Sequence, residues 1–499
     1  MSSLARTERS VLEHLDLYIG GQWVTAADGR RFETIDPYVG HGWASVADAG
    51  PADVDRAVQA AQDAFAGPWG KMTGAQRARL MIRLAEIVER DISELAKVET
   101  RDNGKPIRDA QAQVAQLPQW LRYFAGLADK INGEAISDAH PNFFVYTRRE
   151  PIGVVAGILP WNAPLVLMMF KLAPALAAGC TFIAKPSEFT PASTLEFAKR
   201  VDEAGFPPGV FNVLSSSARE TGASLVAHEG INKVAFTGSV QTGVAVAQAA
   251  AAHLAPTTLE LGGKSPQLIF DDADLFAAVN GVVAGIFAAT GQMCHAGSRV
   301  LVQRTIFSEV VDRVVARARQ IKLGDPSLPE TEMGPISTGN QFARVKDLLK
   351  SALQEGAVAA CGGKADPELG GFFVQPTVLT NVRPEMRVMR EEVFGPVVGM
   401  MAFDTEDEGV AIANDTRYGL AAGIWTNDIR RVHRVAKRLQ TGTVWVNSYR
   451  AAAPSVPFGG QKASGIGREN GINSINEFTE TKAIWVELSG ERRDPFRIG

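Results

Sequence analysis

Length, composition and charge set the first limits on what this chain can be. Its 499 residues exceed the size at which one hydrophobic core usually keeps growing, so we expect more than one structural unit. The composition, 45% hydrophobic and 21% charged, is that of an ordinary globular protein and excludes a disordered chain. The 51 basic and 55 acidic side chains give a net charge of −4, which excludes the excess of positive charge that nucleic-acid binding requires.

The cysteines and the apolar stretches indicate the compartment. Cys180, Cys294 and Cys361 are an odd number at wide spacing, which fits neither a disulfide framework nor a zinc site of CxxC type. No cluster of His, Asp and Glu has the spacing of metal ligands. The first ten residues lack the apolar core of a secretory signal, and the longest apolar stretch, residues 154–184, is interrupted by prolines and a lysine. We therefore expect a cytoplasmic protein with no metal and no membrane partner.

The first half of the chain predicts a Rossmann-like, doubly wound α/β unit. Residues 52–99 carry apolar side chains at three- and four-residue spacing, which predicts helices. Beyond residue 150, short apolar runs alternate with helical segments, which is typical of a parallel sheet covered by helices. We expect its strands at residues 154–158, 181–184, 210–214, 233–236 and 258–261.

A second α/β pattern begins near residue 264, with helices predicted at 275–290 and 308–321 and a strand at 443–447. The segments 135–149 and 478–488 are extended, rich in β-branched and aromatic residues, and belong to neither unit. Because exposed strands of this kind usually pair with another subunit, we expect a small β oligomerisation element.

A cysteine placed just after a predicted helix is the first candidate for chemistry. Cys294 ends the run Gly291-Gln292-Met293-Cys294, where the glycine lets backbone amides approach whatever the sulfur attacks. Most lone cysteines are buried filler, so the assignment as a nucleophile depends on its partners. The neighbouring His295 suggests a Cys–His dyad, but side chains of adjacent residues usually point apart, and we do not assign it as the base.

Two other positions offer such partners. Glu260 lies at the end of an apolar strand, and its flanking leucines predict a burial that would raise the pKa of the carboxyl toward the range of a general base. Asn162 follows another strand in the run Pro160-Trp161-Asn162. Its amide could donate to a developing oxyanion together with the backbone N–H of Cys294.

Together with other motifs in the chain, these residues resemble the aldehyde dehydrogenase superfamily. The motifs that carry the resemblance are Pro160-Trp161-Asn162, Lys185-Pro186-Ser187-Glu188, Phe236-Thr237-Gly238-Ser239, Leu259-Glu260-Leu261-Gly262-Gly263-Lys264, Gly291-Gln292-Met293-Cys294, Glu391-Glu392-Val393-Phe394-Gly395-Pro396 and Pro457-Phe458-Gly459-Gly460. They span nearly the whole chain and occur in the family's order. The resemblance implies an enzyme of the hydrolytic branch, which oxidises an aldehyde to a carboxylic acid with NAD(P)+.

The resemblance also implies a division of the chain and an oligomer. The cofactor-binding domain would comprise residues 1–130 and 150–262, and the catalytic domain residues 263–465. The oligomerisation segments would be residues 131–149 and 478–499, and the protein would be a homodimer or a homotetramer.

The catalytic roles are likewise what the resemblance implies. Cys294 would form a thiohemiacetal with the aldehyde, with Asn162 holding its oxyanion. After hydride transfer, Glu260 would activate the water that hydrolyses the thioester. Lys171 and Glu469 match positions proposed to relay protons from Glu260, and a simple salt bridge between them is the alternative.

The resemblance implies NAD as the cofactor, with NADP as the alternative. The cofactor-binding residues would be Ile158, Pro160, Trp161, Lys185, Ser187, Glu188, Gly222, Phe236, Gly238, Ser239, Leu261, Glu392 and Phe394. The dinucleotide fingerprint GxGxxG is absent, since the turn after residue 214 keeps only Gly222. Because the Glu188 carboxylate would accept hydrogen bonds from ribose hydroxyls and repel a 2′-phosphate, we expect a preference for NAD+.

The substrate pocket is expected at Ala163, Leu167, Phe170, Met293, His295, Ala452 and Phe458. Relatives that oxidise small aliphatic aldehydes carry aromatic rings at the positions of Ala163 and Ala452. Two missing rings predict a wider tunnel and a bulky apolar or aromatic aldehyde as substrate. The alternative is that other side chains fill the space.

Two other functions stay open. A thiol esterase that needs no cofactor could use Cys294 and Glu260 alone, although the cofactor motifs argue against it. A non-catalytic structural protein on the same fold would have no need of either residue, and the presence of both argues against that alternative.

Overall fold

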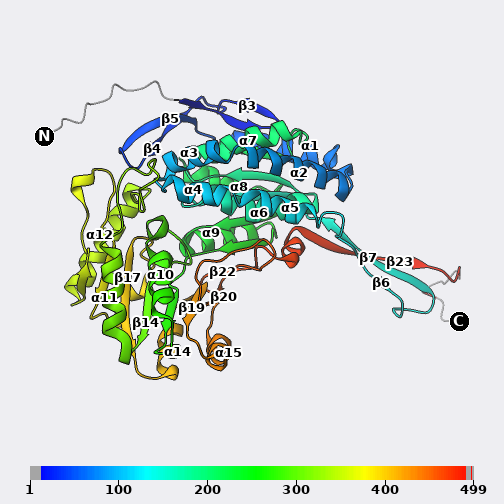
Figure 1. Ribbon diagram of the computed structural model, residues 1–499. Helices are drawn as coiled ribbons and strands as arrows, with labels where there is room; N and C mark the ends of the chain where they lie inside the picture. The colour runs from blue at the N-terminus through cyan, green and yellow to red at the C-terminus, as the bar shows by residue number, and fades with distance from the viewer. Residues whose placement is uncertain (1–12, 491–495, 497–499) are drawn as a thin grey trace.

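The computed structural model describes residues 13–490 and residue 496, which form two α/β bodies and a projecting β arm (Figure 1). Residues 1–12, at the start of the expected cofactor-binding domain, lie outside the described residues. So do residues 491–495 and 497–499, at the end of the second expected oligomerisation segment. Within the described part, none of the helices has the length and apolar character needed to cross a bilayer.

The first body is built on an eight-stranded sheet whose five central strands are parallel. In spatial order they are β12 (Thr257–Glu260), β11 (Lys233–Thr237), β8 (Val154–Ile158), β9 (Thr181–Lys185) and β10 (Phe211–Val213). The five apolar runs expected from the sequence form these strands. From β8 the chain adds β9 and β10 on one side and β11 and β12 on the other. The order therefore reverses between β8 and β11, which opens a crevice at their carboxyl ends.

Short antiparallel strands complete the sheets of this body. The large sheet is extended by β2 (Leu17–Ile19), β3 (Gln22–Val24) and β22 (Gly465–Ile466). A small separate sheet contains β1 (Glu13–Leu15), β5 (His41–Ala47) and β4 (Arg31–Asp36).

The large sheet is buried on both faces because its apolar side chains alternate between two cores. Val155 packs into one hydrophobic cluster, and its neighbours Val154 and Ala156 pack into another. The first cluster is covered by α2 (Gly74–Arg90), α3 (Ile92–Asn103), α4 (Ile107–Val114), α5 (Leu117–Ala125), α6 (Pro164–Ala178) and α7 (Ala192–Ala204). The second is covered by α1 (Pro51–Ala66), α8 (Arg219–Ala227) and α9 (Val240–Ala251). The expected helical stretch 52–99 thus forms most of α1 to α3.

The second body contains a seven-stranded sheet that is parallel except for its edge strand β15. Its order is β15 (Val358–Cys361), β16 (Thr377–Thr380), β17 (Val397–Phe403), β14 (Arg299–Gln303), β13 (Pro266–Ile269), β19 (Ala421–Trp425) and β20 (Thr443–Val446). Its helices are α10 (Leu275–Ile286), α11 (Phe307–Ala318), α12 (Gly339–Gln354), α13 (Arg387–Arg390), α14 (Glu406–Asn414) and α15 (Ile429–Arg438). The two α/β bodies confirm the expected fold class.

One expected helix is shorter than the sequence pattern indicates. The apolar periodicity predicts a helix over residues 275–290, but α10 ends at Ile286. Ala289, Thr290 and Gly291 all have positive φ angles, of 49°, 58° and 70°. Three consecutive residues in the left-handed region cannot continue a right-handed helix, so the chain turns away before it reaches Cys294.

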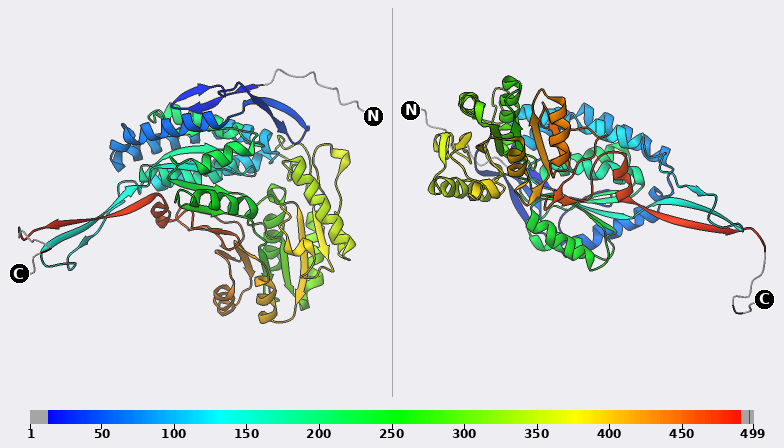
Figure 2. Two further views of the ribbon diagram at one scale, coloured as in Figure 1. Left: turned by 180° about the vertical axis from the view of Figure 1, so that it is seen from behind. Right: turned by 90° about the horizontal axis from the view of Figure 1, so that it is seen from below.

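The arm is a long antiparallel pair of strands that leaves the first body, as Figures 1 and 2 show. Along its whole length β7 (Phe143–Pro151) pairs with β23 (Thr479–Glu487), and the short β6 (Ala135–Ile136) lies on the other side of β7. One edge of β7 is therefore paired along its whole length within the chain, whereas β6 covers only Val145 and Tyr146 of the other edge. Pairing of these strands with another subunit stays a prediction. The outer edge of β23 carries no strand in the described residues.

The two large sheets meet through opposite edges, and this arrangement creates the candidate site. Glu260 ends β12 and residues 159–162 follow β8, so both lie at the carboxyl edge of the first sheet. Cys294 precedes β14 and Glu392 precedes β17, so both lie at the amino edge of the second sheet.

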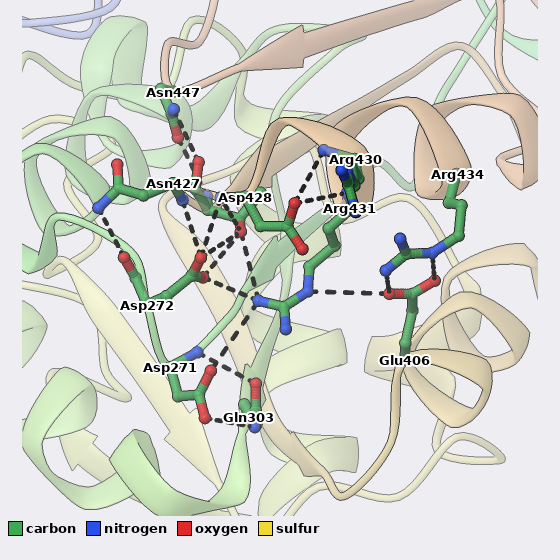
Figure 3. Close-up of polar contacts among 11 residues, drawn as sticks. Asp271, Asp272, Gln303, Glu406, Asn427, Asp428, Arg430, Arg431, Arg434 and Asn447 are labelled. Atoms are coloured by element: carbon green, nitrogen blue, oxygen red, sulfur yellow. Dashed lines mark hydrogen bonds and ion pairs between the residues drawn. The ribbon is translucent and has the colours of Figure 1, made fainter.

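The carboxyl edge of the second sheet lies away from that meeting place and is closed by a polar network (Figure 3). Here too the strand order reverses, between β13 and β19. Asp272, which follows β13, accepts hydrogen bonds from Thr426 Oγ1 at 2.7 Å and from the backbone N–H of Asp428 at 3.0 Å. Arg431 on α15 binds the same carboxylate at 2.8 Å, and Asn447 donates to the carbonyl of Thr426. Protein side chains therefore occupy this second crevice.

Candidate active site

A cavity of about 600 Å³ lies between the two bodies, and it brings most of the expected catalytic and cofactor residues together. The expected residues that line it are Pro160, Trp161, Asn162, Leu167, Gly238, Ser239, Glu260, Leu261, Cys294, Glu392 and Phe394. A cleft of this size, with polar and charged groups set among apolar side chains, is typical of a cofactor or substrate site.

Cys294 lies in a tight turn on the catalytic-body side of the cavity. The left-handed run 289–291 leads into the turn, and the N–H of Ala296 donates to the carbonyl of Met293, so Cys294 and His295 are its central residues. Burial and the negative charges of Glu260 and Glu392 raise the pKa of the Cys294 thiol. The sulfur therefore carries its proton in this environment and needs a base before it can act as a nucleophile.

Glu260 brings a carboxyl group into the cavity that is buried without a hydrogen-bond partner among the described residues. Its side chain is buried at 3% exposure, and neither carboxyl oxygen has a hydrogen-bond partner in the described structure. A Cβ on Gly459 would lie 2.7 Å from Oε1, so the glycine leaves the space that this carboxyl occupies. Burial and the charge of Glu469 raise the pKa of Glu260 well above its ordinary value, in the direction that the flanking leucines predict. Buried carboxyls without a hydrogen-bond partner are rare in proteins. Those that occur are concentrated at catalytic sites.

Lys171 and Glu469 form a buried ion pair behind Glu260. Lys171 on α6 also donates to Thr237 Oγ1 at 2.6 Å, and one oxygen of Glu469 has no hydrogen-bond partner among the described residues. Burial raises the pKa of Glu469, while the charge of Lys171 opposes this rise. The salt bridge expected as one alternative is present in this geometry. A proton relay through the same residues stays a prediction.

Asn162 connects the two bodies at the bottom of the site. It lies between β8 and α6, and its Nδ2 donates to the carbonyl of Gln292 at 2.8 Å, two residues before Cys294. The amide donor therefore points to the loop that carries the sulfur, where it can reach an oxygen bound at Cys294.

His295 points toward Cys294, which corrects the expectation that the two adjacent side chains point apart. Its Nδ1 lies 3.8 Å from the sulfur. The expectation applies to extended strands, whereas these two residues share the centre of a tight turn, where neighbouring side chains can lie on one side. Burial lowers the pKa of His295 to about 3, so the ring is neutral near pH 7. A neutral imidazole at this distance can form a weak hydrogen bond with the thiol, but it carries no positive charge that would stabilise a thiolate.

The first body offers an anion site to the cavity. Ser239 caps the N-terminus of α9 by accepting a hydrogen bond from the Thr242 N–H at 3.2 Å. Gly243, in the first turn, lets the helix pack on Leu261, because a Cβ there would lie 2.5 Å from Cδ2. Free N–H groups and the helix dipole at such a terminus favour phosphate.

The second body contributes a carboxylate and a ring opposite that helix. The N–H of Gly263 donates to Glu392 Oε1 at 3.0 Å, and burial raises the pKa of Glu392 to about 7. Phe394 has a φ of 54°, a strained backbone for a residue with a side chain, and its ring meets Trp161 edge to face at 5.2 Å across the cleft. The strain indicates that the position of the ring serves the site.

The remaining expected cofactor residues lie along the same sheet edge without lining the cavity. Lys185 ends β9, and its buried ammonium donates to the carbonyls of Pro186 and Ser216 at 3.2 and 3.4 Å. Ser187 donates to Glu188 at 3.1 Å. A Cβ on Gly222 would lie 3.7 Å from Cε of Lys185, so a small side chain would fit there. The strand residues Ile158 and Phe236 complete this set.

Sequence analysis missed several residues that line the cavity. They are Thr237, Val240, Gln241, Val244, Gly262, Gln341, Arg344, Arg417 and Tyr418. Thr237 and Gly262 lie inside quoted motifs, and Val240 and Gln241 directly follow one, so these four could have been found from the motifs. Gln341 on α12 donates to the carbonyls of Val393 and Phe394, which fastens the loop of Glu392. Nothing in the local sequence marks such a distant helix as part of the site.

The expected substrate residues divide between the cavity, the core and the surface. Leu167 lines the cavity, whereas Met293 is buried in the core of the second body. Phe458 lies between the rings of Phe170 and His295, at 6.3 and 6.2 Å. Ala163 is half-buried before α6, and Ala452 is exposed.

The two catalytic candidates approach one cavity from different bodies, beside a helix terminus suited to phosphate. This arrangement of a thiol and a carboxyl group beside a phosphate-type helix terminus is typical of an enzyme site. The sequence profile of the Aldehyde dehydrogenase family matches residues 23–484. The chain belongs to the aldehyde dehydrogenase family.

Three similar proteins illustrate the match. Retinal dehydrogenase 2 of Homo sapiens is 43% identical over 483 residues, which cover 96% of this chain and 92% of the relative. The (Z)-2-((N-methylformamido)methylene)-5-hydroxybutyrolactone dehydrogenase of Acinetobacter baylyi is 42% identical over 488 residues, with coverage of 97% and 99%. Among solved structures, the NAD+ complex of aldehyde dehydrogenase from Bacillus cereus matches with a TM-score of 0.94 at 45% identity, covering 96% of this chain and 97% of that chain.

These comparisons confirm the family, the fold and the expected class of enzyme, an oxidoreductase that acts on an aldehyde group. They do not favour an esterase or a structural protein. The two relatives carry very different substrate names, so the comparisons leave the aldehyde open.

Proposed function

We propose that this protein oxidises a bulky apolar or aromatic aldehyde to its carboxylic acid, with NAD+ as the cofactor. The observation that carries the proposal is the buried, unpartnered Glu260 carboxyl, which faces the same cavity as Cys294. A thiol adds to aldehydes, and a base in the same cavity can activate the water that releases an acyl group from sulfur.

The residues act in a fixed order in this mechanism. The Cys294 thiol gives its proton to water in the cavity as the sulfur attacks the carbonyl carbon, and the oxyanion that forms accepts hydrogen bonds from Asn162 Nδ2 and the Cys294 N–H. After oxidation the acyl group remains on Cys294 as a thioester. Glu260 then takes a proton from water as the water attacks that thioester, and the thiolate leaves. In this proposal the buried pair of Glu469 and Lys171, whose charges act on the Glu260 carboxyl, takes the proton on from Glu260.

The cavity fits a nicotinamide dinucleotide by its chemistry. The N-terminus of α9 at Ser239 suits the pyrophosphate, and the Glu392 carboxylate suits ribose hydroxyls. Lys185 and Glu188, at the end of β9, would hold the adenosine ribose. When bound, the cofactor supplies the hydride acceptor for the oxidation. The Bacillus cereus relative was solved as an NAD+ complex, which supports the assignment.

The test is NADH formation by purified protein with benzaldehyde, a long-chain aldehyde and acetaldehyde, measured by absorbance. We expect turnover with NAD+ and a lower kcat/KM with NADP+, because Glu188 repels a 2′-phosphate. Absence of NADH formation with every aldehyde would overturn the proposed activity. A higher kcat/KM with NADP+ would overturn the cofactor assignment alone.

The substrate class rests on the small side chains at Ala163 and Ala452 and on the rings near the sulfur. His295, Phe170 and Phe458 form an aromatic group that can contact a planar substrate. We expect aromatic or long-chain aldehydes to exceed acetaldehyde in kcat/KM by at least about tenfold. Ala163→Phe should reduce activity on the bulky substrate more than on acetaldehyde, and equal reductions would show that Ala163 does not line the tunnel.

We also propose the domain division expected from the sequence and a homodimer or homotetramer. The two sheets support the boundary near residue 262, and the β arm supports the oligomerisation segments. Phe144, Trp485 and Val486 on the arm are 48%, 55% and 40% exposed, and a second copy could cover them. Light scattering of wild type and Trp485→Glu should show an oligomer that the substitution weakens, whereas a monomeric wild type would contradict the proposal.

A further inference from the structure

Arg450 stands out because it is a cation next to the nucleophile loop that no step of the proposed mechanism uses. It lies in the segment that follows β20, between Tyr449 and Ala451. Tyr449 Oη donates to the carbonyl of His295 at 2.8 Å, and Trp445 Nε1 donates to the carbonyl of Ala451 at 2.9 Å. The first bond fastens the segment to the loop of Cys294, and the second fastens it to β20, so the chain is held on both sides of Arg450.

The position of Arg450 is held by its backbone as well as by its neighbours. Its φ of 72° lies in the left-handed region, which arginine rarely adopts. Non-glycine residues in this region are concentrated at binding and catalytic sites, where the surrounding contacts hold them. The strain directs attention to the side chain.

The guanidinium is left with unused binding capacity. Nη1 donates to the carbonyl of Ala284 on α10 at 3.1 Å, and no carboxylate in the described part of the chain lies within ion-pair distance of Arg450. Burial lowers the pKa of Arg450, and the charge of Asp109 on α4 opposes that effect from beyond contact distance. An arginine has five N–H donors in a planar fork, which matches a carboxylate.

The segment of Arg450 adjoins the residues around the Cys294 sulfur, because Tyr449 bonds the His295 carbonyl. The charge of Arg450 contributes to the lowered pKa of His295, whose Nδ1 lies 3.8 Å from the Cys294 sulfur. His295 also lies edge to face with Trp445 at 5.7 Å and with Phe458 at 6.2 Å. An aldehyde bound to Cys294 therefore lies beside these aromatic rings, and Arg450 directly follows Tyr449, which bonds the His295 carbonyl.

We propose that Arg450 binds a carboxylate on the substrate, so that the preferred substrate is an aldehyde acid with an aromatic or other planar apolar body between its two ends. This inference rests on the proposed aldehyde oxidation and narrows its substrate class. Arg450 is then a specificity residue that contacts the far end of the substrate and takes no part in the chemistry at sulfur.

The test compares 4-carboxybenzaldehyde with methyl 4-formylbenzoate, which has the same ring and no charge. Wild type should prefer the acid in kcat/KM by about tenfold or more, the effect of one charge-assisted pair. Arg450→Met should remove that preference mainly through KM while leaving the ester within about twofold, and Arg450→Lys should restore part of it.

A matched control separates recognition from stability. Arg319 also donates to a single backbone carbonyl, that of Ala360 at 3.1 Å, and it lies in the second body after α11. Arg319→Met should leave the ratio of the two substrates unchanged. Asp109→Asn should increase kcat/KM for the acid, because it removes a negative charge near Arg450.

The outcomes distinguish this inference from the proposed function. Turnover of both compounds with no preference for the acid, or an equal loss on both in Arg450→Met, would overturn the role of Arg450 and leave aldehyde oxidation standing. No turnover of either compound, of benzaldehyde or of the long-chain aldehyde would overturn the proposed function itself.

Discussion

Two sheet edges in this molecule share a topology and differ in chemistry. The strand order reverses between β8 and β11 in the first body and between β13 and β19 in the second, so each sheet offers a crevice at its carboxyl edge. In the first crevice, Glu260 is buried without a hydrogen-bond partner. In the second, Asp272 accepts from Thr426, Asn427 and Asp428 and pairs with Arg431 (Figure 3). Topology provides a place for a ligand, and the unsatisfied group shows which place is used.

The largest expected effect comes from removing the proposed nucleophile, which faces the crevice of the first sheet. Cys294→Ala should lower kcat by at least about 10⁴-fold, because no other thiol among the described residues lines the cavity. The cofactor contacts are untouched, so NAD+ binding by fluorescence titration should stay within about twofold of wild type. Substantial aldehyde oxidation by this variant would reject Cys294 as the nucleophile.

Glu260→Gln should have the next largest effect, a fall of roughly 10² to 10⁴ in steady-state turnover. Oxidation should proceed once, giving one NADH per active site in a rapid burst, and the acyl-enzyme should then persist. Because the pKa of Glu260 is raised, its carboxyl is protonated in the lower part of the pH range, and wild-type thioester hydrolysis should slow as the pH falls. The variant should lack this pH dependence. An unchanged steady-state rate or an unchanged pH profile would remove Glu260 from its role.

Asn162→Ala removes one oxyanion donor and should lower kcat by roughly 10² to 10³. The variant also loses the bond to the Gln292 carbonyl, so Asn162→Asp serves as a control that keeps the size of the side chain but lacks its donor. Stopped-flow rates of the burst should fall in both variants. A normal burst in Asn162→Asp would show that the amide donor is unnecessary.

Substitutions at the carboxyl edge of the second sheet should lower the stability of the protein and hardly change its activity. Arg431 is 23% exposed, pairs with Asp272 at 2.8 Å and lies 4.6 Å above the ring of Phe270. Arg431→Met leaves Asp272 without its ion pair and should lower the free energy of unfolding by about 1–3 kcal/mol, measured with urea. Arg434 lies on the same helix as Arg431, and its exposed side chain pairs with Glu406 at the start of α14. Arg434→Met removes that pair and should cost less than about 1 kcal/mol. Equal costs, or a loss of kcat in either variant, would break the comparison of the two edges.

The sequence predicted the strands of the first sheet well because their apolar runs are short and bounded by turns, as in β8. It identified Cys294 and Glu260 because their motifs are local. It failed where the backbone leaves regular conformations: the left-handed residues that end α10 show no signal in apolar periodicity, and the turn that directs His295 toward Cys294 reverses a rule drawn from strands. Residues such as Gln341 were missed because only the three-dimensional packing brings α12 to the cavity.

Because Glu260 and Cys294 lie on opposed sheet edges, the enzyme can lose activity without unfolding. Glu260 belongs to the first body and Cys294 to the second, so their effective concentration with respect to each other depends on how the two bodies sit together. A displacement of one body by about an ångström would separate nucleophile and base while each sheet kept its hydrogen bonds. Inactivation should therefore precede unfolding when urea is raised slowly, with activity lost before the circular dichroism of the helices. The hydrogen bond from Asn162 to the Gln292 carbonyl joins the two bodies and helps to hold them in this arrangement.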